Sequence, residues 1–403
     1  MKLELLAPAG DMAKLKTALY YGADAVYLSG TAYGLRAYAG NFDEEQMQKA
    51  VEYTHGMGKS LYTAVNIYAF NDDFKGLPEY IRGLERIGVD GVIVSDPGIL
   101  SVVREVSDLP IHLSTQANTT NKYAAKFWAE QGVSRIVLAR ELSLKDICNI
   151  RDALPEDVEL EAFVHGAMCV SYSGRCLLSS FLTGRNGNRG ECVQACRWDY
   201  EVREKSKGGE YLTVDEDKRG TYIFNSKDLN MLAYIDKLSE VGISSFKIEG
   251  RMKSEYYVAT TVNAYRRAID SYQDAPTEYK ANAELVAELD KVGHRKYTTG
   301  FYFGQCDTEC TDTSKPEQEY DYIADVVGYH GGVARLIMRN RFKKGDELEV
   351  LSPSGSFNKI IKIEDLTDTD GVTVEDAKLV QQVLLLKTDI PLAQGDILRK
   401  KSA

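Results

Sequence analysis

The fold of this chain is indicated at its start, where residues 3–30 read LELLAPAGDMAKLKTALYYGADAVYLSG. Two short apolar runs, Leu3–Ala7 and Ala25–Ser29, are typical of strands that are buried on both faces. Between them, Leu15 and Leu19 recur at the spacing of one helix face. The stretch therefore predicts a strand, a helix and a second strand parallel to the first.

The same alternation continues over about 250 residues, which is the usual length of a (β/α)8 TIM-type barrel. The alternative is a doubly wound sheet, which usually has fewer strands and a glycine-rich phosphate-binding turn after the first strand. The turn here, Ala7–Gly10, lacks that motif, so the barrel is favoured. The six further apolar runs are Ser60–Asn66, Gly91–Ser95, Ile111–Ser114, Arg135–Ala139, Leu160–Val164 and Ser245–Glu249.

One connection departs from this pattern, because the seventh and eighth strands are separated by about 80 residues, and a loop of that length is normally functional. It leaves the carboxyl end of a strand, the face where barrel enzymes have their active sites. We therefore predict a barrel at 1–275 with a cysteine-rich insertion at 166–244. A helical linker at 276–317 and a small β-barrel or β-sandwich domain at 318–403 follow, since short alternating strands recur there.

Composition and charge restrict the classes of protein to be considered. The 403 residues include 49 Lys+Arg and 60 Asp+Glu, a net charge of −11. This charge argues against non-specific nucleic-acid binding over the whole surface, although not against a local basic groove. No apolar stretch is long enough to span a membrane, and the first residues do not resemble a signal peptide. We therefore expect a cytoplasmic protein with no membrane partner.

Four of the seven cysteines lie close together in the insertion, at Cys169, Cys176, Cys192 and Cys196. Cytoplasmic thiols are kept reduced, so such a group indicates a metal or iron–sulfur site and not disulfides. The spacing fits neither a zinc ribbon nor a compact ferredoxin motif, and it favours a cluster enzyme over a structural zinc site. A set of reduced thiols without a metal is the other alternative.

Polar side chains near the carboxyl ends of the predicted strands form a second group of candidates. Glu161 and His165 belong to the seventh strand, and such a pair could perform acid–base chemistry. Arg140 follows the sixth strand and Arg251 the eighth, and two arginines could clamp a dicarboxylate. Asn118 lies beyond the fifth strand. A single strand histidine is, however, more often a core residue than a catalytic one.

The insertion is basic although the chain as a whole is acidic, because it contains Arg175, Arg185, Arg189 and Arg197. Arginine suits phosphate or carboxylate ligands, and the neighbouring Trp198 suits stacking on a single-stranded nucleic-acid base. A solvated loop is the alternative interpretation. A second basic strip, with the same alternative, comprises Arg335, Arg339, Arg341, Lys343 and Lys344 in the β-domain.

The segment EAFVHGAMCVSYSGRCLLSS at Glu161–Ser180 resembles the signature of peptidase family U32, the collagenase-like peptidases. The resemblance extends over roughly residues 1–310, and the carboxyl-terminal β-domain resembles that of the tRNA-hydroxylating members. Further matching blocks are LLAPAG at Leu5–Gly10, GADAVYLSG at Gly22–Gly30, LSTQAN at Leu113–Asn118, ECVQACRW at Glu191–Trp198 and FKIEGR at Phe246–Arg251.

The resemblance implies a prephenate-dependent hydroxylation of the wobble uridine of tRNA to 5-hydroxyuridine, with a 4Fe-4S cluster. The implied partners are tRNA and the small dicarboxylate prephenate, and a partner subunit or a homo-oligomer is compatible with this. By position, the four cysteines of the insertion match the cluster ligands. Arg140, Arg175, Arg251 and Asn118 would bind the substrate, and Glu161 and His165 would transfer protons or order the cluster loop.

Three other functions stay open at this point. A peptidase of the same family could use Cys169 and His165 as a dyad, although this leaves the other clustered thiols unexplained. Hydroxylation of another RNA is the second alternative. A non-catalytic RNA- or partner-binding protein is the third.

Overall fold

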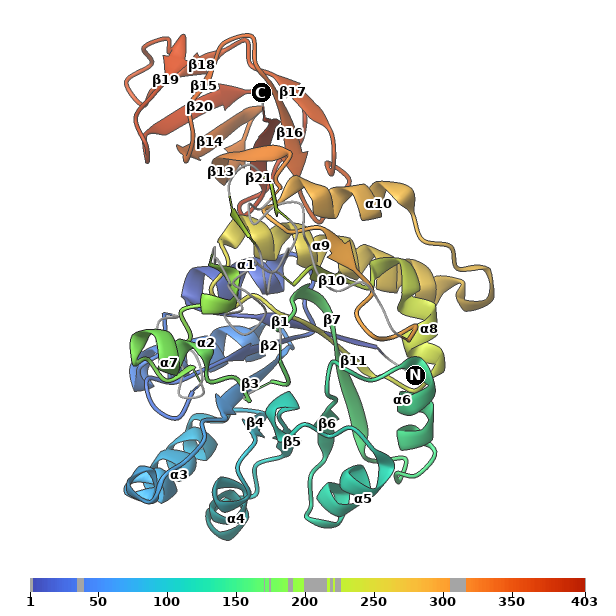
Figure 1. Cartoon of the computed structure of the whole chain (residues 1–403). Helices are drawn as coiled ribbons and strands as arrows, with labels where there is room; N and C mark the ends of the chain where they lie inside the picture. Colours follow the sequence, from blue (N-terminus) through green and yellow to red (C-terminus); the bar gives the residue numbers. More distant parts are fainter. Residues whose placement is uncertain are drawn as a thin grey trace, which may run out of the picture.

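The computed structural model describes residues 3–34, 40–169, 171–173, 175–187, 191–198, 216–217, 220–221, 226–304 and 317–402. Its larger part is the expected parallel eight-stranded barrel, and an antiparallel β-domain follows at the carboxyl end (Figure 1). Both parts of the predicted fold class are therefore confirmed. In Figure 1 the β-domain, in orange and red, lies to one side of the barrel, next to the long helix α9.

The barrel closes because its first strand pairs with its last, which also pairs in parallel with β7. The remaining neighbours follow in sequence order, all parallel. These strands are apolar at nearly every position, because the helices cover one face of the sheet and the barrel interior covers the other. The barrel strands are β1 (Glu4–Pro8), β2 (Ala25–Leu28), β3 (Ser60–Val65), β4 (Gly91–Val94), β5 (Ile111–Leu113), β6 (Arg135–Val137), β7 (Glu159–Ala167) and β11 (Ser245–Ile248).

The helices around the barrel begin where a polar side chain can accept a hydrogen bond from a backbone N–H of the first turn. Asp11 accepts from the Lys14 N–H, and Asn121 and Ser254 cap later helices in the same way. The outer helices are α1 (Met12–Tyr20), α2 (Glu44–Gly56), α3 (Leu77–Ile87), α4 (Pro97–Val106), α5 (Lys122–Glu130), α6 (Leu144–Arg151), α8 (Ile235–Glu240) and α9 (Glu255–Asp274).

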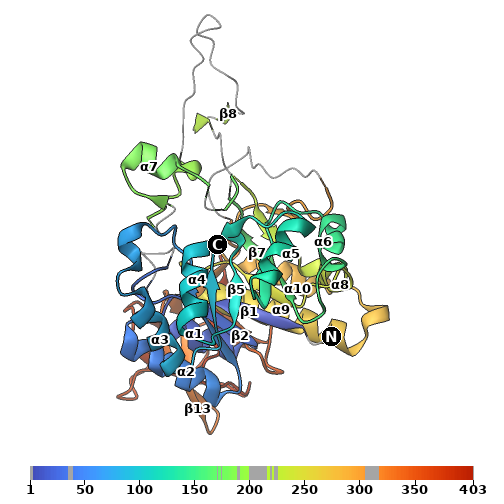
Figure 2. The ribbon, with the colours of Figure 1, turned by 90° about the horizontal axis from the view of Figure 1, so that it is seen from below.

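The seventh strand continues beyond the barrel and supports the insertion. The end of β7 pairs antiparallel with β10 (Asp228–Asn230), and β10 pairs with β12 (Tyr297–Thr298). The described parts of the insertion also include α7 (Leu178–Thr183) and the short pair β8 (Glu216–Asp217) and β9 (Gly220–Thr221). Figure 2 shows α7 standing out from the body of the barrel.

The β-domain is an antiparallel sheet in the order β17-β16-β21-β13-β14-β20-β18, with a separate pair β15–β19. It has its own apolar core. Its strands are β13 (Tyr320–His330), β14 (Val333–Met338), β15 (Phe342–Lys343), β16 (Glu347–Leu351), β17 (Ile360–Lys362), β18 (Leu366–Thr367), β19 (Asp376–Ala377), β20 (Val383–Lys387) and β21 (Ile397–Lys401).

Buried charge joins the β-domain to the barrel. Arg399 of β21 is fully buried and donates to Glu288 Oε2 and to Glu349 Oε1, both at 2.8 Å. Glu288 lies on α10 (Ala283–Glu288), which packs on α9. Removing one partner of such a buried group would leave an uncompensated charge, so the network ties the two parts together. No helix in the described residues is long and apolar enough to cross a membrane.

Candidate functional site

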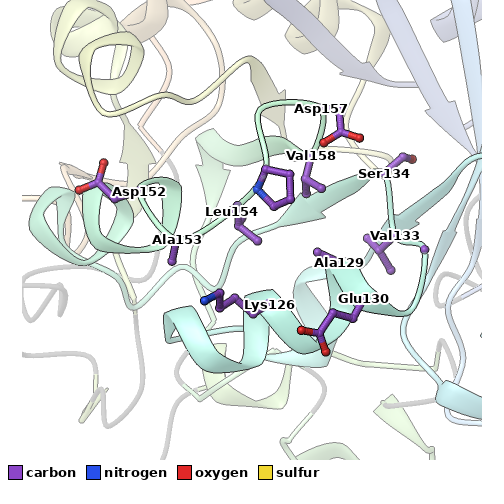
Figure 3. A pocket seen from close by; sticks show the side chains of 12 residues that line it. Lys126, Ala129, Glu130, Val133, Ser134, Asp152, Ala153, Leu154, Asp157 and Val158 are labelled. Carbon is purple, nitrogen blue, oxygen red and sulfur yellow. The ribbon is translucent and has the colours of Figure 1, made fainter.

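Two hollows lie at opposite ends of the barrel. One, of about 630 Å³, lies before the amino-terminal ends of β6 and β7, where Lys126, Glu130, Asp152 and Asp157 line it (Figure 3). The other, of about 500 Å³, lies at the carboxyl ends of the strands, under the insertion. Barrel enzymes have their active sites at the carboxyl ends, so the second hollow, the mouth cavity, is the candidate site.

All four cysteines of the insertion line the mouth cavity. The backbone N–H of Leu178 donates to Cys176 Sγ, and that of Gln194 donates to Cys192 Sγ, both at 3.4 Å. Among the residues that the structure describes, no three His, Cys, Asp or Glu side chains are arranged to hold a metal ion. The thiols therefore share one cavity without meeting at one point. As a donor set they suit zinc or an iron–sulfur cluster and not a hard cation.

Two buried arginines border the same cavity. Arg140 Nη1 donates to the Ala167 carbonyl at 2.7 Å, and its guanidinium lies 4.1 Å from the centre of the Phe163 ring. Arg251 Nη2 donates to Asn41 Oδ1 at 2.9 Å. These contacts fix the two guanidinium groups in position, as recognition of a carboxylate or phosphate requires.

Several polar atoms of the cavity wall are buried and have no hydrogen-bond partner in the described structure. They are Asn66 Oδ1, Gln116 Oε1, Ser171 Oγ and Arg140 Nε, and all four residues line the cavity. A buried polar atom without a partner costs about 1–3 kcal/mol. Such atoms gathered around one hollow are typical of a site for a polar ligand.

Glu161 lies inside the barrel, below the mouth cavity, and is fully buried. Its Oε1 accepts a hydrogen bond from Lys247 Nζ at 2.6 Å, and its Oε2 accepts one from Arg135 Nη1 at 3.3 Å. Lys247 Nζ also lies 4.5 Å from the centre of the Tyr27 ring, and Lys247 lines the cavity. Glu161 itself does not line the cavity, and its carboxylate holds the ammonium group of Lys247 at the cavity floor.

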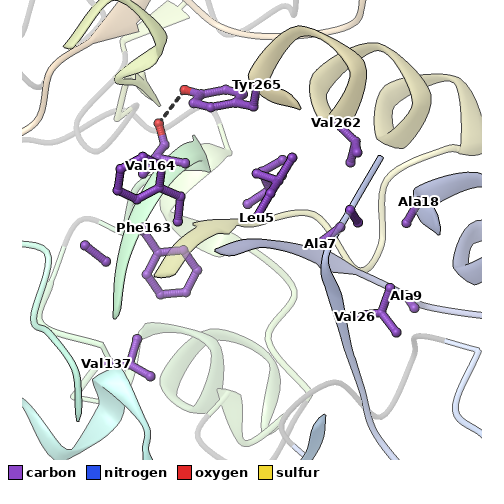
Figure 4. Packing of buried hydrophobic residues seen from close by; sticks show 14 of the residues in the cluster. Leu5, Ala7, Ala9, Ala18, Val26, Val137, Phe163, Val164, Val262 and Tyr265 are labelled. Atoms are coloured by element: carbon purple, nitrogen blue, oxygen red, sulfur yellow. Dashed lines mark hydrogen bonds between the residues drawn. The ribbon is translucent and has the colours of Figure 1, made fainter. Parts of the chain in front are cut away.

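His165 lies outside the mouth cavity, packed among tyrosines. Its ring centre is 5.5 Å from those of Tyr265 and Tyr297 and 5.9 Å from that of Tyr257. Figure 4 shows Tyr265 beside this strand, where its hydroxyl donates to the Val164 carbonyl at 2.7 Å. Burial, with a smaller contribution from Lys253, lowers the pKa of His165 to about 3. The imidazole is therefore neutral at pH 7, and a catalytic role for it stays a prediction.

A change of strand register explains the position of His165. Phe163 pairs with Lys247, but His165 pairs with the very next residue, Ile248, so β7 bulges at this point. A bulge turns the following side chain to the other face of the sheet. Gly166 then follows with φ +107°, and a Cβ there would lie 2.6 Å from the Glu249 carbonyl oxygen. Only glycine allows the two strands to approach so closely.

Asn118 and Arg175 lie beside the mouth cavity but do not line it. Asn118 has a left-handed backbone, and its Nδ2 donates to the carbonyls of Gln116 and Ser173 at 2.9 and 3.1 Å. It therefore ties the end of the fifth strand to the insertion. Arg175 is exposed, with its guanidinium 5.9 Å from the centre of the Tyr68 ring.

Other basic candidates lie on the insertion and on the β-domain. Arg189 and the side chain of Arg197 lie outside the described residues. Three cations of the β-domain strip have acidic partners: Arg339 pairs with Asp325, Arg341 with Asp376, and Lys344 with Glu375. These pairs lower the positive charge that the strip offers to RNA.

Lys247 belongs to the polar residues near the predicted strand ends, although the sequence alone could also place its side chain toward the helix layer, and Ser171 was not predicted. For Lys247 a signal exists, because Ser245, Lys247 and Glu249 alternate along the predicted strand Ser245–Glu249 and therefore share one face. Ser245 donates to Glu4 inside the barrel, and Glu249 lines the mouth cavity. For Ser171 the sequence holds no comparable signal, since it lies in irregular backbone.

The comparisons with known proteins agree with this architecture. The family model of peptidase family U32 matches residues 10–312, and that of the U32 carboxyl-terminal domain matches residues 318–399. A Bacillus subtilis protein named tRNA hydroxylation protein P1 is 40% identical over 99% of this chain and 95% of its own length. An Escherichia coli 23S rRNA 5-hydroxycytidine synthase is 37% identical over 67% of this chain and 40% of its own length.

A third relative carries a different name. A Porphyromonas gingivalis protein called collagenase is 31% identical over 87% of this chain and 87% of its own length. Because the family model covers most of the barrel and a second model covers the β-domain, the chain belongs to peptidase family U32.

Proposed function

We propose that this chain hydroxylates the wobble uridine of tRNA at C5, in a prephenate-dependent reaction that uses a 4Fe-4S cluster. The observation that carries the proposal is the mouth cavity, where four thiols lie beside two buried guanidinium groups. Two of the three relatives described above have names that refer to RNA hydroxylation, which supports RNA as the substrate class. This substrate would also place the protein in the cytoplasm.

The chemistry of the donor set supports the cluster. Cys169, Cys176, Cys192 and Cys196 would hold it at the roof of the cavity. When bound, a cluster of this kind supplies electron transfer or activation of an oxygen donor. The backbone N–H groups that already point at Cys176 Sγ and Cys192 Sγ would stabilise thiolates there, and hydrogen bonds to sulfur tune the potential of such clusters.

The two arginines support a small dicarboxylate as co-substrate. Arg140 and Arg251 would each take one carboxylate, because a guanidinium fork matches carboxylate geometry. Lys247 adds a third cation at the floor, and Glu161 holds it there. The unpartnered oxygens of Asn66 and Gln116 would accept hydrogen bonds from hydroxyl groups of the ligand. Asn118 would order the wall, and Arg175 would meet ligands at the rim.

Glu161 and His165 were expected to transfer protons or to order the cluster loop, and the geometry supports the second role. Both side chains are buried away from the cavity surface. The His165 ring packs against three tyrosines, which would hold the end of β7 just before Cys169, and Glu161 would act through Lys247. The same position weakens the peptidase alternative, because a Cys–His dyad needs the imidazole beside the thiol.

Nucleoside mass spectrometry of tRNA tests the proposal. Cells that lack this gene should lose 5-hydroxyuridine and its derivatives, and the intact gene should restore them. Cys169→Ser should fail to restore them and should contain less iron after anaerobic purification. Cys148→Ser on α6 is the matched control, because this exposed cysteine does not line the mouth cavity and should be fully active. Normal nucleosides with Cys169→Ser would contradict the proposal.

A further inference from the structure

We propose that the exposed apolar side chains of the insertion form a base-stacking surface for unpaired nucleotides of RNA. This surface, the insertion rim, comprises Tyr172, Leu177, Phe181, Leu182 and Trp198. The inference rests on the proposed function, since it names where the RNA would bind, and it commits to one occupant, an RNA loop with unstacked bases.

The rim consists of large apolar side chains that the fold leaves in solvent. Phe181 of α7 is 83% exposed, and Leu182 beside it is 48% exposed. The opposite face of α7 is turned to the cysteines, where Ser179 is buried and lies with its Oγ 3.7 Å from Cys192 Sγ. Contiguous exposed apolar side chains are typical of interaction sites. One face of α7 therefore points to the mouth cavity, and the opposite, exposed face would bind RNA.

The rim is continuous with the mouth cavity. Tyr172 belongs to both, because it lines the cavity and is 50% exposed. Ser179 of α7 also lines the cavity, so the helix that carries Phe181 borders it, although Phe181 lies on the outer face. A strand of RNA whose bases stack on the rim would therefore pass the entrance to the cavity at Tyr172.

The charge of the insertion favours RNA over a protein as the partner of the rim. Residues 171–198, which contain the whole rim, have four arginines (Arg175, Arg185, Arg189 and Arg197) and one acidic residue (Glu191), although the whole chain has a net charge of −11. A basic segment on an acidic protein favours a phosphate backbone. Aromatic side chains interspersed with arginine are the combination that binds single-stranded nucleic acid, because every base has a face that can stack. Duplex RNA offers no such faces.

A binding experiment on the full-length protein tests this. The probe is a fluorescent hairpin RNA with a seven-nucleotide loop, compared with a fully paired duplex of the same length. Phe181→Ala should weaken binding of the hairpin by about tenfold, which is the usual effect of losing one base–aromatic stack. Phe181→Trp should bind as well as the unchanged protein. Tyr53→Ala is the matched control, because Tyr53 on α2 is 37% exposed and lies beside Lys16 of α1, away from the insertion.

Three results would overturn the inference: equal binding of hairpin and duplex, no effect of Phe181→Ala, or no binding of the hairpin at all. Sedimentation of Phe181→Ala adds a fourth, because a change in oligomeric state would mean that the rim covers a second copy of the chain. The nucleoside assay is independent of these outcomes. Hydroxylated tRNA with full activity of Phe181→Ala would reject the rim and keep the proposed function, whereas Phe181-dependent binding without hydroxylation would do the opposite.

Discussion

The two ends of the barrel interior differ in how far their buried polar groups are paired. At the amino-terminal end, Arg135 contacts Glu4 and Glu159 at 2.6 Å, and Ser245 donates to Glu4 at 2.7 Å. At the carboxyl end, buried polar atoms of Asn66 and Gln116 have no partner in the described structure. The first end is mostly paired, which favours stability, although His112 Nδ1 beside Tyr62 has no partner in the described structure. The unpartnered atoms at the carboxyl end lower the stability of the protein, and proteins tolerate such a loss where a ligand binds those atoms.

The largest effect on stability is expected from a substitution among the paired groups below the mouth cavity. Glu161→Ala would leave Lys247 and Arg135 without their shared buried carboxylate, and losing one partner of a buried pair costs about 3–5 kcal/mol of unfolding free energy. Urea unfolding at pH 7 measures this. Glu159→Ala is the matched control, because Glu159 also binds Arg135 but is 48% exposed, so its loss should cost about 0–1 kcal/mol. Equal effects of the two changes would contradict the distinction between buried and exposed partners.

At the carboxyl end the main expected loss is in activity. Arg140→Met should raise the KM for the dicarboxylate by about 10–100-fold, since hydrogen bonds to charged groups contribute about 1.5–3 kcal/mol. Its unfolding free energy should fall by less than that of Glu161→Ala, by about 1–3 kcal/mol, because the Ala167 carbonyl loses the hydrogen bond from Arg140. Steady-state kinetics and urea unfolding of the same preparation check both statements. Arg104→Met on α4 serves as the control, and an unchanged KM for Arg140→Met would remove this residue from the site.

The pH dependence of stability should report His165. Its pKa is lowered to about 3 in the folded protein, from 6.5 in the unfolded chain, so the unfolded state binds more protons between these values. Stability is therefore present above pH 6.5 and is lost as the pH falls, by about 1 kcal/mol between pH 6.5 and 5.5. His165→Gln should show a shallower decline over this range. Parallel declines for both proteins would mean that His165 is not buried as described.

The smallest effect is expected from removing an unpartnered group. Gln116→Met keeps the side-chain length but removes the buried Oε1, so stability should be unchanged or rise by up to about 1 kcal/mol. Thermal unfolding measures the change. The same substitution should reduce hydroxylation, because the ligand loses an acceptor. A clear loss of stability would show that Gln116 has a structural partner, and the comparison between the two ends would then fail at this residue.

The barrel could be predicted from the sequence because its signals are local. Apolar runs such as Leu3–Ala7 and helical periodicity such as that of Leu15 and Leu19 are properties of neighbouring residues. The strands β10 and β12 were not predicted, since segments of three and two residues show no periodicity. They form because the free edge of β7 accepts them.

The candidate site could be predicted only in part. The order of residues places the cysteines after the seventh strand and the arginines at strand ends, and the structure brings Arg140 and Arg251 to the same cavity as the thiols. Strand alternation would place His165 on the same face as Glu161, and the bulge after Phe163 reverses this. Sequence reasoning has no means of locating a single shifted register, because the shift arises where β7 pairs with β11, a strand far away in the sequence.

The buried network around Arg399 fixes the position of the β-domain relative to the barrel. Rotating the β-domain away from the barrel would separate Arg399 from Glu288, so the interface opposes hinge motion. Arg267 Nη2 on α9 also shares its two hydrogens among the backbone carbonyls of 352–354, which lie within 3.1 Å. The span between the β-domain surface and the mouth cavity is therefore fixed. If an RNA contacted both parts, it would have to match this span.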